Sequence, residues 1–444
     1  MKPHAAARET ASVRARVAAA GIVGNILEWY DFALYGYLAT IFAGQFFPSS
    51  DPLTSLIGAY AVFAIGFLAR PLGGLIYGHI GDRYGRRRLL TLSVVLMGVP
   101  TFLLGLLPTY ASVGVLAPVL LVALRFIQGI STGGEFVGSI VFLVEHAPPK
   151  RRAFFGSLAN FGSLIGGLLG AAVAWLMTAL LPSAELYDWG WRLPFLSGII
   201  VAGAGLWIRL GVDESPIFRE MHDKGAIEDW PIRTALHDHP KEIAATAGLN
   251  WLPSVGYYMV FVWLTADLSK VVGLNLSTAL GIGTLGLLLA TLVTPAIGAL
   301  TDRIGPRKVL AVAGFTAVLT SIPLLLLAGL GTVPAATAAQ LGLALIMAIY
   351  LGAMPVVFVS LHSARVRCSS LSIGYNSAVA IAGGTAPLIA TTLVSVTGWQ
   401  AAPGLYLTAS AIIGLSLLPF VPRSAAMNRQ QPTAPAKAPT SHAR

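Results

Sequence analysis

The stretch GDRYGRRRLL at residues 81–90 returns as TDRIGPRKVL at residues 301–310. An aspartate, two arginines, a glycine and a leucine recur at matching positions of the two copies. Each copy lies between the second and third long apolar stretches of its half of the chain. Chance similarity of two basic loops would not explain that matched position, so the repeat indicates a molecule built from two related halves.

The composition places the chain in a membrane. It has 444 residues, of which 55% are apolar and 11% are charged, and its mean hydropathy is +0.75. A soluble domain carries about 25% charged residues, so this chain cannot cover the surface of a soluble protein of its size. High hydrophobicity also excludes a chain that is disordered in water. The one cysteine, Cys368, excludes an intramolecular disulfide and a cluster of thiolate metal ligands.

Apolar runs of roughly 20 residues, the length that crosses a bilayer, occur twelve times. The fold class that we expect is therefore an all-α membrane protein with twelve transmembrane helices in two six-helix halves. The expected spans lie near 18–43, 55–77, 89–107, 113–143, 154–181, 193–210, 243–265, 276–300, 309–330, 334–361, 369–396 and 404–421.

The positive charges predict the orientation. Of the 29 lysines and arginines, 25 fall on one side of the predicted spans, and Arg209 is counted among them as a residue of the loop after the sixth span. Cytoplasmic loops hold the positive excess, so both termini are expected in the cytoplasm of a bacterial cell, with the chain as a multi-pass protein of the inner membrane. The net charge of +10 then needs no nucleic-acid partner.

The same pattern divides the chain into five parts. They are a cytoplasmic N-terminus (1–17), a six-helix half (18–210), a cytoplasmic central loop (211–242), a second six-helix half (243–421) and a disordered cytoplasmic tail (422–444). No phosphate-binding G-x-x-x-x-G-K-[ST] loop and no H-E-x-x-H pair occurs. We therefore expect no enzyme activity, no cofactor and no metal.

Several segments resemble a known family. The loop GDRYGRRR at 81–88 resembles the signature loop of the major facilitator superfamily. Five segments resemble the metabolite:proton symporter branch of that superfamily. They are GNILEWYDFALYGYLA at 24–39, FLARPLGGLIYGHIGDRYGRR at 67–87, RFIQGISTGGEF at 125–136, WGWRLPF at 189–195 and GYNSAVAIAGGTAPLIATTL at 374–393. The resemblance implies a proton-driven importer of small metabolites, mostly carboxylates such as citrate, 2-oxoglutarate or shikimate, with proline/betaine carriers as close relatives.

Ionisable side chains within spans are costly and usually face the interior of the bundle. The first half holds five of them, namely Glu28, Asp31, Arg70, Arg125 and Glu135. Glu28 and Asp31 share one helix face, and two carboxylates in a site of low dielectric disfavour double ionisation. We therefore expect proton coupling at Glu28, Asp31 or Glu135, with a structural ion pair as the alternative for each.

Polar and aromatic side chains at depth predict the substrate site. Arg125, Gln128 and Glu135 fall on one face of the fourth span, given 3.6 residues per turn. Arg125 is expected to anchor substrate, to act as the counter-ion of a proton relay, or to form a structural pair with Glu28 or Asp31. Arg70 either binds a carboxylate or extends toward the inner face. The expected substrate-binding residues are Arg70, Arg125, Gln128, Tyr35, Asn250, Tyr257 and Asn376.

The repeated loops predict a gate. Asp82 is expected to contact a helix N-terminus or the arginines beside it, and such contacts would lock the cytoplasmic end. The expected gating residues are Asp82, Arg83, Arg87, Asp302 and Arg303. Gly162, Gly166 and Gly170 have the spacing that permits close helix packing, and Gly383, Gly384 and Pro387 indicate a flexible or broken helix beside the site.

Three functions follow from these features. The leading hypothesis is a proton-coupled symporter that imports a small carboxylated metabolite by alternating access. The alternative is a carrier of proline or betaine, against which the absence of heptads in residues 422–444 argues, because relatives of that kind can carry a C-terminal coiled coil. The third is a membrane sensor that binds a metabolite without moving it. The expected partners are the substrate, protons and the bilayer, and the chain is expected to be a monomer.

Overall fold

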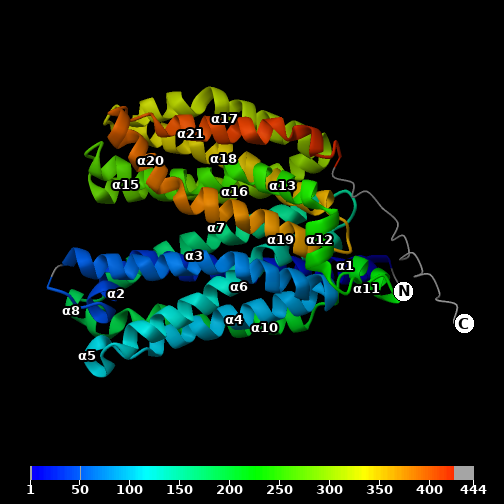
Figure 1. Cartoon of the computed structure of the whole chain (residues 1–444), viewed down its shortest axis with the longest axis horizontal. Helices are drawn as coiled ribbons and strands as arrows, with labels where there is room; N and C mark the ends of the chain where they lie inside the picture. The colour runs from blue at the N-terminus through cyan, green and yellow to red at the C-terminus, as the bar shows by residue number, and fades with distance from the viewer. Residues whose placement is uncertain (1–2, 51, 425–444) are drawn as a thin grey trace, which may run out of the picture.

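The computed structural model describes residues 3–50 and 52–424. Most of them lie in helices that run side by side along the long axis of the molecule (Figure 1). These described residues contain no β-strand. The helices that precede residue 211 group together in the lower part of the view, and those that follow residue 239 group in the upper part.

The first group of helices spans residues 3–210. Its elements are α1 (Pro3–Tyr37), α2 (Ala39–Phe46), α3 (Pro52–Arg83), α4 (Arg86–Leu106), α5 (Tyr110–Val113), α6 (Leu116–His146), α7 (Arg152–Leu180), α8 (Ser183–Glu185), the π-helical turn η1 (Leu186–Gly190), α9 (Arg192–Leu196) and α10 (Gly198–Leu210). Two short helices follow in the segment that connects the groups, α11 (Pro216–Asp223) and α12 (Pro231–Asp238).

The second group begins at residue 240. Its elements are α13 (Pro240–Leu249), α14 (Trp251–Tyr258), the π-helical turn η2 (Met259–Trp263), α15 (Leu264–Lys270), α16 (Leu276–Ile304), α17 (Pro306–Ala328), α18 (Val333–Leu361), α19 (Arg367–Ala378), the π-helical turn η3 (Val379–Gly383), α20 (Gly384–Thr397), α21 (Pro403–Ser416) and the 3-10 turn η4 (Leu418–Phe420). Near Gly383, where the sequence predicts a flexible or broken helix, the helix continues from α19 to α20 through the π-helical turn η3.

Nine helical segments of the described residues are long and apolar enough to cross a membrane. The other expected spans are helical too, but α1 is not among the nine, residues 240–270 are divided into shorter elements, and α21 has only 14 residues. The chain is thus a multi-pass membrane protein, while twelve crossings and cytoplasmic termini stay predictions. The tail from residue 425 lies outside the described residues.

Glycines set the closest helix contacts of the first group. A methyl group on Gly162 or Gly166 of α7 would lie 2.8 Å or 2.5 Å from carbonyl oxygens of α1. One on Gly133 of α6 would lie 2.2 Å from the carbonyl oxygen of Arg70 on α3. The close packing predicted for the glycines of α7 is therefore confirmed, and Gly133 likewise brings together α3 and α6, which bear buried charges.

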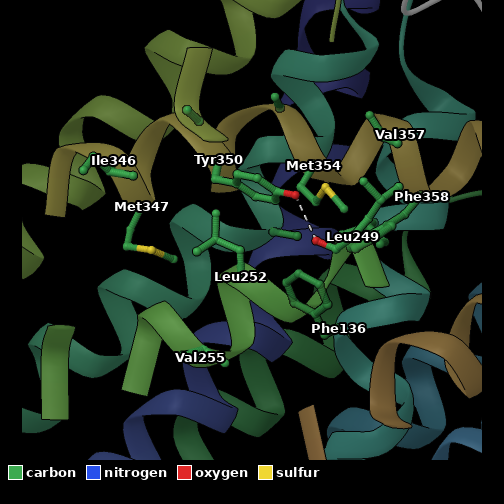
Figure 2. Packing of buried hydrophobic residues seen from close by; sticks show 14 of the residues in the cluster. Phe136, Leu249, Leu252, Val255, Ile346, Met347, Tyr350, Met354, Val357 and Phe358 are labelled. Atoms are coloured by element: carbon green, nitrogen blue, oxygen red, sulfur yellow. Dashed lines mark hydrogen bonds between the residues drawn. The ribbon is translucent and has the colours of Figure 1, made fainter. Parts of the chain in front are cut away.

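The apolar core extends across the boundary between the two groups. Figure 2 shows Leu249, Leu252, Tyr350 and Phe358 of the second group packed together with Phe136 from α6 of the first group. The Tyr350 hydroxyl donates a hydrogen bond of 3.0 Å to the carbonyl oxygen of Leu249. This shared core joins the two groups beside the cavity described below.

One end of the bundle collects the charged loops. The start of α1, the short helices α11 and α12 and the end of α21 all lie there (Figure 1). We call it the basic end and define it by the turns at 84–85, 147–151, 211–239, 305 and 362–366. In the predicted orientation it faces the cytoplasm.

The two repeated loops have the same conformation in the structure. Gly85 and Gly305 precede α4 and α17, with φ of 104° and 90°, values that glycine adopts without the strain that a side chain would bring. Arg87 donates to the carbonyl oxygen of Leu210 at the end of α10, and Arg307 donates to Pro419 and Val421 beyond α21. Each loop thus ties the last helix of its own group.

Candidate functional site: a cavity between the two helix groups

A cavity of about 60 Å³ lies between the two groups of helices. Because a buried water needs roughly 15 Å³ measured in this way, the cavity holds only a few waters in this conformation. The first group lines it with Trp29, Arg70, Phe136, Asn160, Ser163 and Leu164. The second group lines it with Asn250, Pro253, Ser254, Tyr257, Tyr258, Leu351, Met354, Pro355, Phe358, Tyr375 and Val379.

Aromatic rings join the two groups around this cavity. The ring centroids of Trp29 and Tyr257 are 4.7 Å apart, and those of Phe136 and Tyr375 are 4.8 Å apart. In both pairs one ring comes from each group. The side chains of Asn160 and Asn250 add amide groups to this wall, and Ser254 adds a buried hydroxyl that has no hydrogen-bond partner among the described residues.

Arg70 is the one cationic side chain among the described residues that line the cavity. It lies on α3, one residue before Pro71, and it is buried. One guanidinium nitrogen, Nη1, lies 3.6 Å from Glu28 Oε1, while its Nε has no hydrogen-bond partner within the described part of the chain. Arg70 therefore faces the cavity, and its binding of a carboxylate stays a prediction.

Asp31 has three donors around it. Arg125 forms a buried ion pair with it, and Gln128 Nε2 and Thr101 Oγ1 each donate to Asp31 Oδ1 at 3.0 Å. The guanidinium of Arg125 also lies 4.0 Å from the centroid of the Tyr35 ring. This is the structural pair that the sequence allowed for Arg125, with Asp31 as the partner.

Glu135 pairs with an arginine that the sequence placed elsewhere. Arg209, near the end of α10, is buried and forms an ion pair with Glu135, to which Ser93 also donates. Arg209 Nε donates to the carbonyl oxygen of Ala20 at 3.0 Å. The assignment of Arg209 to a loop is therefore wrong, because the helix continues to Leu210 and turns this guanidinium into the bundle. A methyl group on Gly24 would lie 2.0 Å from Glu135 Oε1, so this pair depends on a glycine in α1.

The residues expected to bind substrate separate into two sets. Arg70, Asn250 and Tyr257 line the cavity. The other four, Arg125, Gln128, Tyr35 and Asn376, do not line the cavity. Arg125 and Gln128 bind Asp31, and Tyr35 packs against the guanidinium of Arg125. Asn376 donates to the carbonyl oxygen of Gly133 at 2.8 Å. A role of this second set in binding stays a prediction.

Sequence reasoning missed most of the aromatic lining. Trp29, Phe136 and Tyr375 carry no mark that distinguishes them from residues facing lipid, since aromatic side chains suit both surroundings. The one available signal was position: Trp29 follows Glu28, and Tyr375 precedes Asn376, so each stands next to a polar residue at membrane depth.

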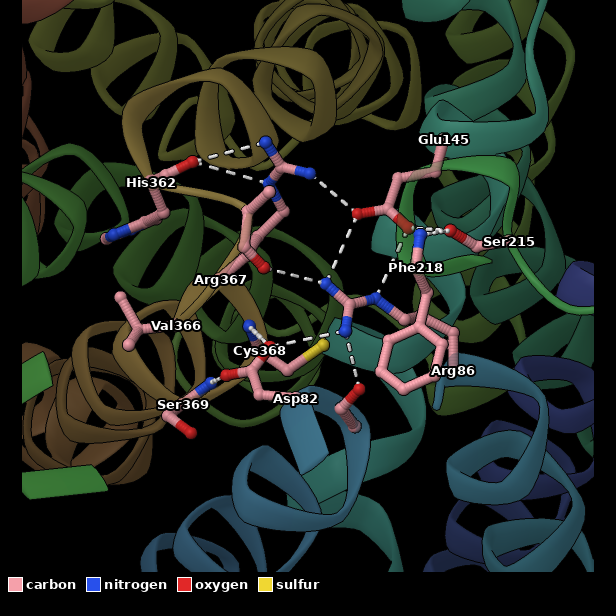
Figure 3. A network of polar contacts seen from close by, with 12 residues as sticks. Asp82, Arg86, Glu145, Ser215, Phe218, His362, Val366, Arg367, Cys368 and Ser369 are labelled. Carbon is pink, nitrogen blue, oxygen red and sulfur yellow. Dashed lines mark hydrogen bonds and ion pairs between the residues drawn. The ribbon is translucent and has the colours of Figure 1, made fainter. Parts of the chain in front are cut away.

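A polar network closes the basic end (Figure 3). Glu145 at the end of α6 accepts from Arg86 Nε at 3.2 Å and from Arg367 Nη1 at 2.6 Å. Arg86 Nη1 lies 3.5 Å from Asp82. Arg367 begins α19 of the second group, so the network joins the two groups. Arg367 also donates to the backbone carbonyl oxygen of His362. The imidazole of His362 is buried, and this burial lowers its pKa to about 3.

The two repeated aspartates make equivalent contacts across the boundary. Asp82 accepts hydrogen bonds from the backbone N–H groups of Cys368 and Ser369, at 3.0 and 2.8 Å, in the first turn of α19. Asp302 accepts from the backbone N–H groups of Ala153 and Phe154, at 2.8 and 2.9 Å, in the first turn of α7. Each carboxylate thus caps a helix of the opposite group, where the unpaired N–H groups and the helix dipole favour an anion.

The connecting segment adds a bridge of two adjacent carboxylates. Glu228 pairs with Arg365 of the second group, with 2.5 Å between Oε2 and Nη2, and Asp229 pairs with Arg83 of the first group. Of the other residues predicted to gate, Arg87 donates from its side chain to Leu210 of its own group and from its backbone N–H to Glu214 of the connecting segment, and Arg303 is exposed.

These features define a class of protein: a two-part helical membrane protein with a polar and aromatic cavity between its halves. Residues 21–374 match the sequence model of the Major Facilitator Superfamily, and the chain belongs to that family.

Proteins that are similar to this chain are named as transporters or symporters. A "Proline/betaine transporter" of Salmonella typhimurium is 34% identical over 411 residues, which are 89% of this chain and 81% of the relative. A "Shikimate transporter" of Escherichia coli is 34% identical over 407 residues, covering 90% and 93% of the two chains. The solved structure of the proton:xylose symporter XylE bound to 6-bromo-6-deoxy-D-glucose covers 94% of this chain and 98% of its own, with a TM-score of 0.72 and 17% identity.

Proposed function

We propose that this chain is a proton-coupled symporter for a small zwitterionic solute of the proline or betaine type, which binds in the cavity between the two halves. The observation that carries the proposal is that one guanidinium and several aromatic rings line the same cavity. The relatives named for proline and betaine support it. The expected alternative thus has more support than the leading hypothesis of a citrate-like acid.

The charge of the cavity favours a zwitterion. Arg70 offers one positive charge, and the described lining contains no carboxylate. A guanidinium binds a carboxylate through two parallel hydrogen bonds, and a cation within about 6 Å of an aromatic centroid is attracted to the ring face. A solute with one carboxylate and one ammonium group would use both features. A tricarboxylate would leave two negative charges without a partner.

A monocarboxylate of the shikimate type is the second candidate. The shikimate transporter among the relatives supports it. Its carboxylate would bind Arg70 as well, while its hydroxyl groups would bind Asn160, Asn250 and the unpartnered hydroxyl of Ser254. This candidate keeps the organic-acid hypothesis open in its simplest form.

The contacts at the basic end would serve as the cytoplasmic gate. Asp82 and Asp302 each hold a helix of the opposite half, and Glu228 and Asp229 bridge the two halves from the connecting segment. Opening the cavity to the cytoplasm requires these contacts to break. The structure would then represent a state that is closed on that side, and alternating access would exchange it with one in which the basic end separates.

Uptake by the purified protein in liposomes tests the proposal. With an inward proton gradient, labelled proline or glycine betaine should accumulate, and a protonophore should abolish accumulation. Replacing Trp29 by leucine should raise the KM for betaine about tenfold, because a desolvated cation–π contact is worth about 1–2 kcal/mol. The matched control is Trp175→Leu, since Trp175 is 69% exposed on the outside of α7. Accumulation of citrate without betaine, or equal KM values in the two variants, would refute the proposal.

A further inference from the structure

Away from the basic end, three buried carboxylates of the first half, Glu28, Asp31 and Glu135, differ in how firmly their charge is held. Asp31 has three donors, and Glu135 has its ion pair with Arg209 and a hydrogen bond from Ser93. Glu28 is equally buried, yet neither of its oxygens has a hydrogen-bond partner among the described residues. Burying a carboxylate without hydrogen bonds is costly unless it is neutralised. Of the three, Glu28 is therefore the group most ready to take up a proton.

Glu28 depends on one cation, and that cation faces the cavity. Arg70 Nη1 lies 3.6 Å from Glu28 Oε1, which is longer than the roughly 2.8 Å of a charge-assisted hydrogen bond. Arg70 lines the cavity, whereas Glu28 does not, and Trp29 next to it does. The guanidinium thus contacts both the substrate space and Glu28.

A carboxylate that enters the cavity competes with Glu28 for this guanidinium. Two short hydrogen bonds to the ligand would replace one long contact, so the guanidinium would turn toward the ligand. Glu28 would then be a buried carboxylate without a counter-charge, and a proton from water on one of its oxygens removes that cost. Two other buried arginines of the described structure, Arg125 and Arg209, are already paired with Asp31 and Glu135, so neither is free to replace Arg70.

We infer that Glu28 and the carboxylate of the substrate alternate on Arg70, so that binding of the substrate makes Glu28 take up the coupled proton. When Glu28 loses its proton on the other side of the membrane, it draws Arg70 back and the substrate loses its anchor. For a zwitterion, each cycle moves one net positive charge. The inference rests on the proposed function, in that the cavity must bind a solute with a carboxylate.

Proton uptake during binding tests the inference without transport. Glycine betaine is titrated calorimetrically into the purified full chain in nanodiscs, in two buffers of different ionisation enthalpy at one pH. Above the titration range of Glu28, close to one proton should be taken up per betaine bound, and the Kd should rise about tenfold per pH unit. In Glu28→Gln the uptake should fall to zero and the Kd should not depend on pH. The matched control is Glu185→Gln, which removes an exposed carboxylate. This variant should keep the proton uptake and the pH dependence of the Kd of the wild type.

The possible outcomes distinguish a failure of the Glu28 inference from a failure of the proposed transport function. Binding of betaine by the wild type without proton uptake at any pH would overturn the inference, and this measurement needs no variant to fold. Proton uptake on betaine binding that persists in Glu28→Gln but disappears in Asp31→Asn would overturn the inference and assign the proton to Asp31. Absence of binding by betaine, proline and shikimate alike would refute the proposed function itself. In liposomes, Glu28→Gln should exchange substrate by counterflow but should not accumulate it against a gradient.

Discussion

Replacing Glu135 by glutamine tests whether that carboxylate carries a proton or stabilises the fold. The substitution keeps the shape of the side chain and the hydrogen bond from Ser93, but it leaves the buried charge of Arg209 without a partner. Breaking a buried ion pair on one side costs about 3–5 kcal/mol. Arg209 keeps its bonds to the carbonyl oxygens of Ala20 and Leu90, so we expect a loss near the lower limit, about 3 kcal/mol.

A double-mutant cycle measures this loss. Glu135→Gln combined with Arg209→Met removes both charges, and exchanging a buried pair for neutral residues is often close to neutral. The two carbonyl groups that lose their donor would still cost about 1 kcal/mol each, so the double variant should be more stable than Glu135→Gln alone by about 1 kcal/mol. Thermal unfolding of each variant in the same detergent ranks the four proteins.

The refuting result is specific. If Glu135→Gln unfolds at the wild-type temperature, exchanges substrate by counterflow and fails to accumulate it, then Glu135 is a proton carrier and the structural assignment is wrong. If it unfolds early and the double variant recovers, the ion pair with Arg209 is the main role of Glu135. Glu185→Gln supplies the control for loss of a carboxylate on the surface.

Two further predictions concern the basic end. Asp82→Asn should weaken the cap on α19 and favour the state that is open to the cytoplasm. The single cysteine, Cys368, is buried at that contact, so it should react with a maleimide several-fold faster in this variant. An unchanged reaction rate would contradict the role of this contact as a gate. The folded-state pKa of His362 is about 3, below its unfolded value of 6.5, so its contribution to stability is complete above pH 6.5 and is lost as the pH falls, by about 2 kcal/mol at pH 5. His362→Gln should therefore lose less thermal stability between pH 7.5 and pH 5 than the wild type, and an equal loss would refute the assignment.

Much of the scaffold could be predicted because local patterns determine it. The repeated loops predicted contacts of Asp82 with a helix N-terminus and with an arginine, and both occur. The glycines of α7 predicted close packing, since the spacing of small residues on one helix is visible in the sequence alone. The patterns that predict these features are local in the sequence, although the contact of Asp82 with α19 joins residues 286 positions apart.

The pairing of the buried charges could not be predicted in the same way. Which arginine meets Glu135 depends on the depth at which α10 passes α6, and the sequence places Arg209 only near the end of an apolar run. The aromatic lining raised a different difficulty. In a membrane helix the faces toward lipid and toward the other half are both apolar, so periodicity does not show that Trp29 and Tyr375 point into the cavity.

The distribution of charge between the halves suggests which half deforms during transport. The first half is fastened by two tight buried ion pairs, Asp31 with Arg125 and Glu135 with Arg209. In the second half, the cavity-lining helices α14 and α19 each run directly into a π-helical turn, η2 and η3. Such turns are less regular than α-helix and frequently occur at functional sites, and a methyl group on Gly383 would lie 2.8 Å from the ring of Tyr258. Bending at η2 and η3 would move Tyr257 and Tyr258 against a rigid first half that keeps Arg70 and Glu28 in place. On this reasoning, Gly383→Ala should slow the exchange of substrate more than it weakens proton-linked binding, because the anchoring charges lie outside the part that moves.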